Sequence, residues 1–379
     1  MIEDVNKKTV PIPTTAIVEE QPFVNNNDNI IHEKNKNSND LSTISMVELF
    51  DNIYPPKVPI VENFLYEGTY LFVGSPKVGK SFFMAQLGYC VSRGTPLWGY
   101  TTHPSDVLYL ALEDNYARLQ KRLSTMYGTD AAPNFRMAII AKKLNAGLHE
   151  QLENHIKMYP DTRLIIIDTL KKIRDKEIEQ YSYTADYDII DNLKGFTEKH
   201  RVCLLVVHHT RKQNSDDIFD TVSGSNGLMG AADGGFIMVK QKRVEGKATI
   251  DITGRDQQDQ KLHLQFDKNT FLWNLIKAEN DIVAPPIDPF LEKVSKIVAE
   301  ENRTWQGTAT ELLEVLNDED LQPNTLTRKL NINVDRLVNE YGICYENSRT
   351  RNGSNIKLSK MREQLLLSCD DVTIKTDTL

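Results

Sequence analysis

The stretch Leu71–Phe82 reads LFVGSPKVGKSF and contains the spacing Gly-x4-Gly-Lys-Ser of a phosphate-binding loop. An apolar strand over residues 70–73 precedes the loop and an apolar helix over residues 81–91 follows it, which is the context that this motif requires. The glycines allow a tight turn in which successive main-chain N–H groups point at a triphosphate beside the N-terminus of the helix. The sequence therefore predicts a nucleoside triphosphate site in an α/β domain.

The loop supplies the side chains that are expected to contact ATP and Mg²⁺. Lys80 is expected to meet the β- and γ-phosphates, and the Ser81 hydroxyl is expected to ligate Mg²⁺. The residues predicted to bind ATP are Gly74, Ser75, Pro76, Lys77, Val78, Gly79, Lys80, Ser81 and Phe82. ATP and Mg²⁺ are accordingly the expected cofactors.

A second nucleotide element is the run LIIIDT at residues 164–169. Its apolar side chains predict a buried central strand, and Asp168 would then lie at the carboxyl edge of the sheet, where it can hold Mg²⁺. The alternative is that Asp168 only caps the end of the strand. Beside a complete phosphate loop, the metal-binding interpretation is favoured.

The predicted strand in VLYLALED, residues 107–114, ends in two carboxylates. Glu113, at the tip of a strand beside the phosphate loop, is the candidate catalytic base that orients or deprotonates the attacking water. The alternative makes Glu113 and Asp114 first-turn acids of the helix NYARLQKRL, where the helix dipole favours them. Both interpretations hold if Asp114 caps the helix while Glu113 catalyses.

His208 and His209 end the predicted strand in CLLVVHHT, at the same edge of the sheet. An imidazole there can donate to the γ-phosphate and signal its presence to the following segment, so both are candidate catalytic residues. The alternative is a structural role for a buried histidine. The polar stretches 171–187 and 213–235 either grip single-stranded nucleic acid through basic and aromatic side chains or are solvated and packed.

Arg255, in ITGRDQQ, is the candidate arginine finger. Its planar guanidinium suits a γ-phosphate in the transition state, and in a ring it could reach the site of a neighbouring subunit. Lys242 and Arg243 are rival candidates for the same role. The alternative for Arg255 is a salt bridge to Asp256.

Strands that alternate with helices predict a doubly wound, mostly parallel sheet of the α/β class, ending in β-hairpins between residues 234 and 276. The expected strands of the parallel part are 70–73, 107–112, 137–140, 164–168, 202–208 and 235–240. Helices followed by a short hairpin then predict a small winged-helix-like domain. The predicted parts are a disordered tail at 1–45, the ATPase domain at 46–280, a linker at 281–289, the winged-helix-like domain at 290–361 and a C-terminal tail at 362–379.

Composition narrows the class of protein. The chain has 379 residues and a net charge of −8, which argues against wholesale coating of nucleic acid but allows a local basic path. Its four cysteines are isolated from one another, so neither a disulfide framework nor a zinc site is expected. No apolar run approaches the length of a membrane span, and the first residues lack a secretion signal, so a cytoplasmic protein is expected.

Residues 46–66, with their prolines, are expected to form an extended lead-in.

The motifs GSPKVGKS, LALED, IIIDTL, VVHHTRK, SGSNGLMGAAD and TGRD, in this order and spacing, resemble those of RecA-type ATPases related to the RepA replicative helicase of plasmids. The resemblance covers about residues 45–275. It implies a RecA-like domain in a homo-oligomeric ring, usually a hexamer, with ATP bound between subunits. It also implies single-stranded DNA as a partner and places Arg122, on one helical face with Arg118, near the base or ribose.

The C-terminal part departs from the plasmid helicases and is similar to accessory domains of such ATPases on phages and integrative elements. Arg349, Arg351, Lys357 and Lys360 fall in or beside the expected wing, where they would meet DNA phosphates, whereas the acidic remainder would suit a replication partner protein. The favoured function is a ring-forming ATPase of a mobile element that couples hydrolysis to translocation on or remodelling of single-stranded DNA. The alternative is an ATP-switched DNA-binding initiator, loader or regulator that does not unwind.

Overall fold

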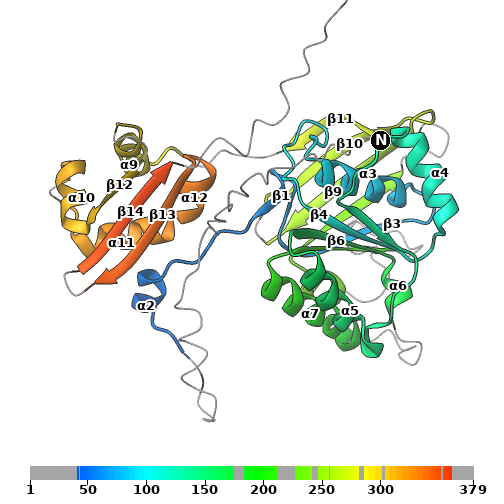
Figure 1. Cartoon of the computed structure of the whole chain (residues 1–379), viewed down its shortest axis with the longest axis horizontal. Coiled ribbons are helices and arrows are strands. Elements are labelled where there is room, and N and C mark those ends of the chain that lie inside the picture. The colour runs from blue at the N-terminus through cyan, green and yellow to red at the C-terminus, as the bar shows by residue number, and fades with distance from the viewer. Residues whose placement is uncertain are drawn as a thin grey trace, which may run out of the picture. The chain divides into compact units, whose positions relative to one another are not determined.

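The protein is described by a computed structural model, in which the described residues are 41, 43–174, 183–210, 227–240, 246–255, 257–280, 286–300, 304–318, 320–350 and 353–360 (Figure 1). The chain divides into two compact units. The larger unit spans Lys57–Pro285, and the smaller unit combines Met1–Pro56 with Pro286–Leu379.

The larger unit contains a nine-stranded sheet in the order β11-β10-β9-β8-β3-β7-β6-β4-β5. Its parallel strands are β3 (Gly68–Gly74), β4 (Asp106–Ala111), β5 (Phe135–Ala138), β6 (Thr162–Asp168), β7 (Cys203–His208) and β8 (Gly234–Lys240). Three antiparallel strands extend the sheet beyond β8, namely β9 (Lys247–Gly254), β10 (Gln260–Phe266) and β11 (Trp273–Asn280). The predicted α/β class, with a mostly parallel sheet and C-terminal hairpins, is confirmed.

Helices cover both faces of the sheet, as a doubly wound fold requires. They are α3 (Lys80–Arg93), α4 (Tyr116–Tyr127), α5 (Leu148–Met158), α6 (Leu170–Ile173), α7 (Tyr183–His200) and α8 (Gly227–Ala231), with a 3₁₀ turn at Leu144–Ala146. Figure 1 shows α3 and α4 on one side of the sheet and α5 and α7 on the other.

The central strand β3 is apolar over residues 70–73 because both of its faces are covered. Tyr70 and Phe72 point into the core beneath α3, and Leu71 and Val73 point into the core beneath α7. Successive side chains of a strand face opposite sides, so a strand covered on both faces has no position left for a polar alternation. These two cores position the carboxyl ends of the parallel strands.

The smaller unit has its own core and a three-stranded antiparallel sheet in the order β12-β14-β13. Its elements after the larger unit are α9 (Pro289–Glu300), β12 (Thr304–Thr308), α10 (Ala309–Leu316), α11 (Pro323–Ile332), α12 (Val334–Asn339), β13 (Ile343–Thr350) and β14 (Gly353–Lys360). Thr308 caps α10, because its side chain accepts from the Glu311 N–H in a capping box. The sequence pattern missed β12, a strand of five residues of which one, Trp305, is buried.

The lead-in before the larger unit matches the expected extended segment only in part. Ser45 and Glu48 form a capping box that starts helix α2 (Met46–Asp51), and a short hairpin of β1 (Pro59–Val61) and β2 (Leu65–Tyr66) follows. The turn of this hairpin contains Asn63 in the left-handed region, a conformation that asparagine tolerates well. Local capping therefore forms a helix before the prolines, whereas residues 53–58, which include Pro55 and Pro56, form neither helix nor strand, and Pro59 begins a strand.

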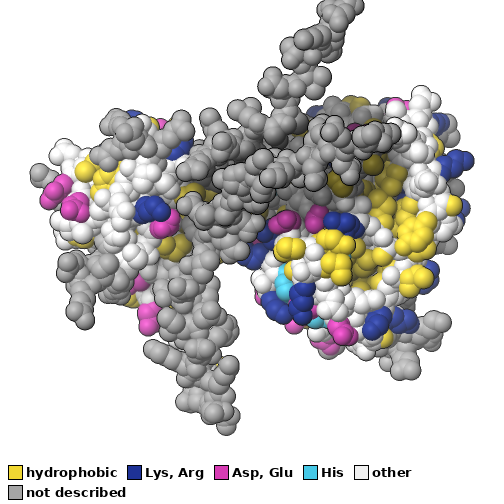
Figure 2. Space-filling view, viewed as in Figure 1, with side chains coloured by type: hydrophobic (Ala, Val, Ile, Leu, Met, Phe, Trp, Pro, Cys, Tyr) yellow, Lys and Arg dark blue, Asp and Glu magenta, His cyan; other side chains and the backbone are white. Residues whose placement is uncertain are grey.

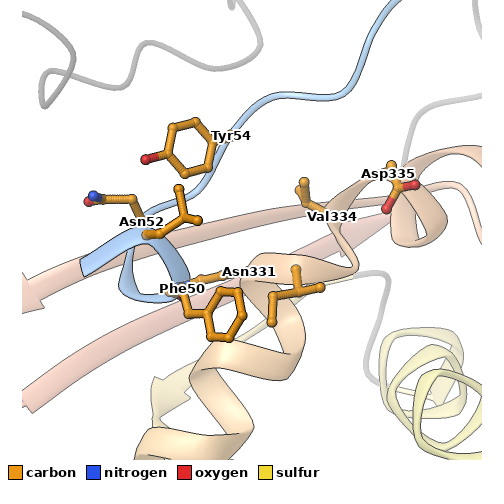
Figure 3. A pocket seen from close by; sticks show the side chains of 8 residues that line it. Phe50, Asn52, Tyr54, Asn331, Val334 and Asp335 are labelled. Carbon is orange, nitrogen blue, oxygen red and sulfur yellow. The ribbon is translucent and has the colours of Figure 1, made fainter. Parts of the chain in front are cut away.

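Helix α2 packs in the smaller unit, so the predicted boundary at residue 46 differs from the structural one at Lys57. The Asp51 carboxylate lies 2.7 Å from Arg328 Nε on α11, and Asn331 Nδ2 donates to the Phe50 oxygen at 3.0 Å. A cavity of about 340 Å³ lies beside this contact (Figure 3). Its lining residues are Leu49, Phe50, Asn52, Tyr54, Asn331, Ile332, Val334 and Asp335.

On the face shown in Figure 2, basic and acidic side chains of the described residues are interspersed. None of the described helices is long and apolar enough to cross a membrane.

Candidate functional site

The phosphate loop connects the end of β3 to the start of α3, and its two glycines are required for different reasons. Gly79, the N-cap of α3, has a φ of 113°, which disfavours any residue with a side chain. Gly74 lies so close to β8 that an added Cβ would be 2.7 Å from the Met238 oxygen. The loop therefore needs glycine once for its backbone conformation and once for close packing against the neighbouring strand.

Lys80 is the first residue of α3, and its side chain folds back over the loop. The residue is 6% exposed, and its Nζ donates to the Gly74 oxygen at 2.6 Å and to the Ser75 oxygen at 3.2 Å. Burial lowers the pKa of Lys80 to about 8, while the negative charges of Asp168 and Glu113 act in the opposite direction. The ammonium is therefore held among oxygens, in surroundings that suit a further anionic partner.

The structure separates the two histidines that end β7. His209 Nδ1 lies 3.2 Å from Lys80 Nζ, and because an ammonium can only donate, the ring accepts at Nδ1. Burial and the charge of Lys80 lower the pKa of His209, which favours the neutral ring that this contact needs. His208 is buried within the sheet, in register with Val73. Of the two, it is His209 that the structure brings to the Lys80 ammonium.

The predicted Mg²⁺ ligands Ser81 and Asp168 lie together. Ser81 Oγ donates to Asp168 Oδ2 at 2.7 Å, and the hydroxyl of the buried Tyr109 donates to the same oxygen at 3.0 Å. Burial raises the pKa of Asp168, and these two donors oppose that shift. A hydroxyl and a carboxylate are the hard oxygen donors that Mg²⁺ prefers, so the residues present fit this cation.

Glu113 lies beside this pair because β4 and β6 are parallel neighbours. Its Oε1 accepts from the Thr169 hydroxyl at 3.3 Å. The Leu112 N–H donates to the main-chain oxygen of Asp168 at 2.8 Å. The carboxyl ends of the two strands are thereby joined directly. The candidate base and the candidate metal ligand meet at one edge of the sheet.

The alternative interpretation of this acidic pair is wrong in both parts. Helix α4 begins at Tyr116 with Asn115 as its N-cap, so Glu113 and Asp114 precede the first turn rather than occupy it. Asp114 does not cap the helix but forms ion pairs with Arg122, at 2.7 Å, and with Arg118, at 3.3 Å. Glu113 is therefore left without a capping role.

Arg122 lies near the phosphate loop, as its expected position beside the nucleotide requires. Its guanidinium stands 5.1 Å from the centroid of the Phe82 ring, and Asp114 fixes its other side. Phe82 in turn contacts Phe266 and Phe271, with ring centroids 5.2 Å apart in both cases. Aromatic residues from β10 and the turn after it thus complete this side of the loop.

Among the described residues, Arg255 makes no hydrogen bond or ion pair with the phosphate loop of its own chain. It is exposed at the end of β9, where Nη2 donates to the Gly230 oxygen at 2.9 Å. Its suggested partner Asp256 and its rivals Lys242 and Arg243 lie outside the described residues. The finger role stays a prediction.

The two polar stretches expected to grip nucleic acid fall largely outside the described residues. Of the first, residues 171–174 and 183–187 are described, and they include the exposed Lys171 and Lys172 of α6. Of the second, residues 227–235 are described.

Sequence reasoning missed several residues of the site. Tyr109 and Thr169 lie inside the recognised runs VLYLALED and LIIIDT, so their place on the segments that carry Glu113 and Asp168 was an available signal. Trp273 contacts Gly79 from the far end of the sheet, and its position in the sequence carried no such signal.

Comparison with known families supports the assignment of the loop. Residues 38–215 match the profile of a family described as an AAA domain. The matched segment contains the phosphate loop, Glu113, Asp168 and His209, and it ends before Arg255. Over these residues the chain is similar to P-loop ATPases of the AAA type. A search among curated proteins finds no match to the chain.

Solved structures of similar fold share few identical residues with this chain. One described as an ATPase domain has a TM-score of 0.47 at 15% identity and covers 56% of this chain and 85% of that chain. A DnaB-like replicative helicase, described with its interactions with primase, has a TM-score of 0.46 at 14% identity and covers 56% of this chain and 58% of that chain. A KaiC-like protein from the archaeon Pyrococcus horikoshii has a TM-score of 0.41 at 15% identity and covers 60% of this chain and 100% of that chain. Likenesses at this level do not transfer a function to this chain.

Proposed function

We propose that the chain is a RecA-like ATPase that assembles into a ring and couples ATP hydrolysis to translocation on, or remodelling of, single-stranded DNA. The observation that carries the hydrolysis is the convergence of Lys80, Ser81, Glu113 and Asp168 at the carboxyl ends of β3, β4 and β6, which are parallel strands of one sheet. The match of residues 38–215 to an AAA domain supports the same activity.

Each residue of this cluster has a defined task in the proposal. Lys80 binds the β- and γ-phosphates with an ammonium that is already desolvated, so the electrostatic attraction is stronger than in water. Ser81 and Asp168 hold Mg²⁺, which neutralises charge on the phosphates when bound. Glu113 accepts a proton from the attacking water or orients it. His209, which contacts Lys80, is the better placed of the two histidines to sense the γ-phosphate.

The ring is proposed because the candidate arginine finger, Arg255, makes no hydrogen bond or ion pair with the phosphate loop of its own chain among the described residues. The Arg255 side chain is exposed, and its hydrogen bond to the Gly230 oxygen leaves donors for a phosphate of a neighbouring subunit. A hexamer is the proposed assembly, by resemblance to the plasmid helicases. Lys171 and Lys172, exposed on α6 directly after the Asp168 strand, support a single-stranded DNA path near the nucleotide.

The smaller unit favours a second candidate function, an ATP-switched DNA-binding initiator, loader or regulator without unwinding activity. Its helices followed by a β-hairpin support a winged-helix interpretation, with β13 and β14 as the wing. Of the basic residues expected there, Lys357 pairs with Glu346 and Lys360 donates to the Tyr341 oxygen. Such surface contacts are weak enough to exchange for a DNA phosphate or for an acidic replication partner.

The test is the rate of ATP hydrolysis in Mg²⁺ buffer with and without single-stranded DNA, using Lys80→Ala as the inactive control. Stimulation by DNA that Lys80→Ala abolishes would support the motor. Turnover that no DNA changes would reject it and leave the ATPase. A strand-displacement assay on a forked duplex then separates the two candidate functions. The switch predicts no strand displacement. It also predicts ATP-dependent assembly, measured as an increase in size with a non-hydrolysable ATP analogue.

A further inference from the structure

Trp273, the first residue of β11, contacts the phosphate loop, although β11 is separated from β3 by three strands of the sheet. Trp273 is 1% exposed, and its indole Nε1 donates to the Gly79 oxygen at 3.3 Å. A Cβ added to Gly79 would lie 2.7 Å from the Trp273 ring, so the ring rests directly on the main chain of the loop. A residue from the C-terminal hairpins is therefore part of the wall of the loop.

We propose that Trp273 is a positioning residue of the nucleotide site, which fixes the direction of the Lys80 N–H group through the Gly79 carbonyl. The proposal rests on the proposed ATP-binding function. A trans peptide unit is planar, so its C=O and N–H bonds point in opposite directions, and holding the Gly79 oxygen orients the Lys80 N–H group. That N–H group is one of the unpaired donors at the start of α3 with which a phosphate is bound.

The indole adds a constraint that the helix alone does not supply. The Gly79 oxygen also accepts from the Phe82 N–H at 3.1 Å and from the Phe83 N–H at 3.2 Å, both within the first turn of α3. Those two donors move with the helix. The Trp273 donor comes from another element, β11. It therefore fixes the Gly79–Lys80 peptide group relative to the antiparallel part of the sheet.

Trp273 is itself held firmly against α3. Its main-chain N–H donates to Gln86 Oε1 at 2.8 Å, and its oxygen accepts from Gln86 Nε2 at 2.9 Å. The oxygen also accepts from Trp98 Nε1 at 2.6 Å. Gln86 lies about two turns further along α3 than Gly79. Trp273 of β11 therefore contacts this helix at two positions, Gly79 and Gln86. These contacts hold the Trp273 main chain, and the 1% exposed indole is enclosed by the core that covers it.

A purely apolar role for Trp273 makes a different prediction. A buried indole generally finds a partner for its N–H group, and a core position that needs only volume accepts phenylalanine with a modest loss of packing. Here the partner is the main chain of the phosphate loop rather than a side chain. Loss of the N–H group alone should therefore weaken nucleotide binding.

The test compares Trp273→Phe with the matched control Trp305→Phe, which lies in the core of the smaller unit. Both are made in the full chain, and binding is measured with a fluorescent non-hydrolysable ATP analogue and Mg²⁺. Trp273→Phe should raise Kd for the analogue and KM for ATP about fivefold, the usual net effect of one hydrogen bond, with kcat within about twofold. Trp305→Phe should leave binding unchanged.

Equal affinities of Trp273→Phe and the wild type, with both proteins folded, would overturn the proposal. If Trp273→Phe does not fold, the double variant Trp98→Phe/Trp305→Phe decides, because Trp273 is then the remaining tryptophan. Its emission should change in a saturable way with an unlabelled non-hydrolysable ATP analogue, and unchanged emission while the fluorescent analogue binds would overturn the proposal. A wild type that binds no analogue would reject the proposed function and this inference together.

Discussion

Replacing the buried ammonium of Lys80 should change how the stability of the larger unit depends on pH. Lys80→Met keeps the length of the side chain but removes its charge. Burial holds the pKa of Lys80 at about 8 in the folded chain, against an ordinary value of 10.5. Since a tenfold change in an equilibrium constant is worth about 1.4 kcal/mol, the fold disfavours the charged form by about 3 kcal/mol.

The sign of the effect follows from the two protonation states. Between pH 8 and pH 10.5 the unfolded chain keeps its Lys80 proton while the folded chain loses it, and stability rises with pH wherever the unfolded state binds more protons. The wild type should therefore gain about 2 kcal/mol over Lys80→Met between about pH 7.5 and pH 10. Other groups that ionise in this range are common to both proteins and cancel in the difference.

The assay is urea unfolding at the two pH values, followed by tryptophan fluorescence. It is performed in a Trp305→Phe background, so that Trp98 and Trp273 report the larger unit alone. Lys77→Met is the matched control, because Lys77 belongs to the same loop but has an exposed side chain. A difference between wild type and Lys80→Met that stays constant with pH would refute the reasoning. Hydrolysis of ATP by Lys80→Met would refute its catalytic role separately.

Three further substitutions test the rest of the site. Glu113→Gln should lower kcat by at least about 100-fold and leave ATP affinity unchanged, because it removes the base alone; steady-state kinetics with near-normal kcat would contradict this. Ser81→Ala should raise the Mg²⁺ concentration for half-maximal hydrolysis about tenfold, as loss of a metal contact does; an unchanged Mg²⁺ titration would exclude Ser81 as a ligand. Tyr109→Phe should lower the free energy of unfolding by about 1–2 kcal/mol, since buried Asp168 loses a donor; an unaltered urea midpoint would argue against that hydrogen bond.

The central sheet and the core of the site could be predicted because both depend on local sequence. Runs such as LIIID are apolar on both faces, and this pattern identified each parallel strand within a few residues. The carboxyl ends of parallel neighbours meet at one edge of a sheet, which is why Glu113 and Asp168 could be placed together from their positions alone.

Other features depend on contacts that the chain makes over long distances in sequence. Strand alternation allows one of two adjacent histidines to reach Lys80, but the geometry at the end of β7 determines that it is His209. Trp273 meets Gly79 because the antiparallel extension returns to α3, and no local pattern specifies that return. The placement of α2 depends likewise on Arg328 and Asn331, which follow it by more than 270 residues.

That placement of α2 makes the larger unit an insertion within the smaller one. The chain enters the smaller unit before Pro56, leaves it, and returns to it at Pro286. A single proteolytic cut in either connection would leave the units covalently joined through the other, so release of the larger unit requires two cuts. A C-terminal fragment that starts at Pro286 would also lack the Phe50 oxygen that pairs with the buried Asn331 amide. The smaller unit is therefore completed only when both ends of the chain have been made.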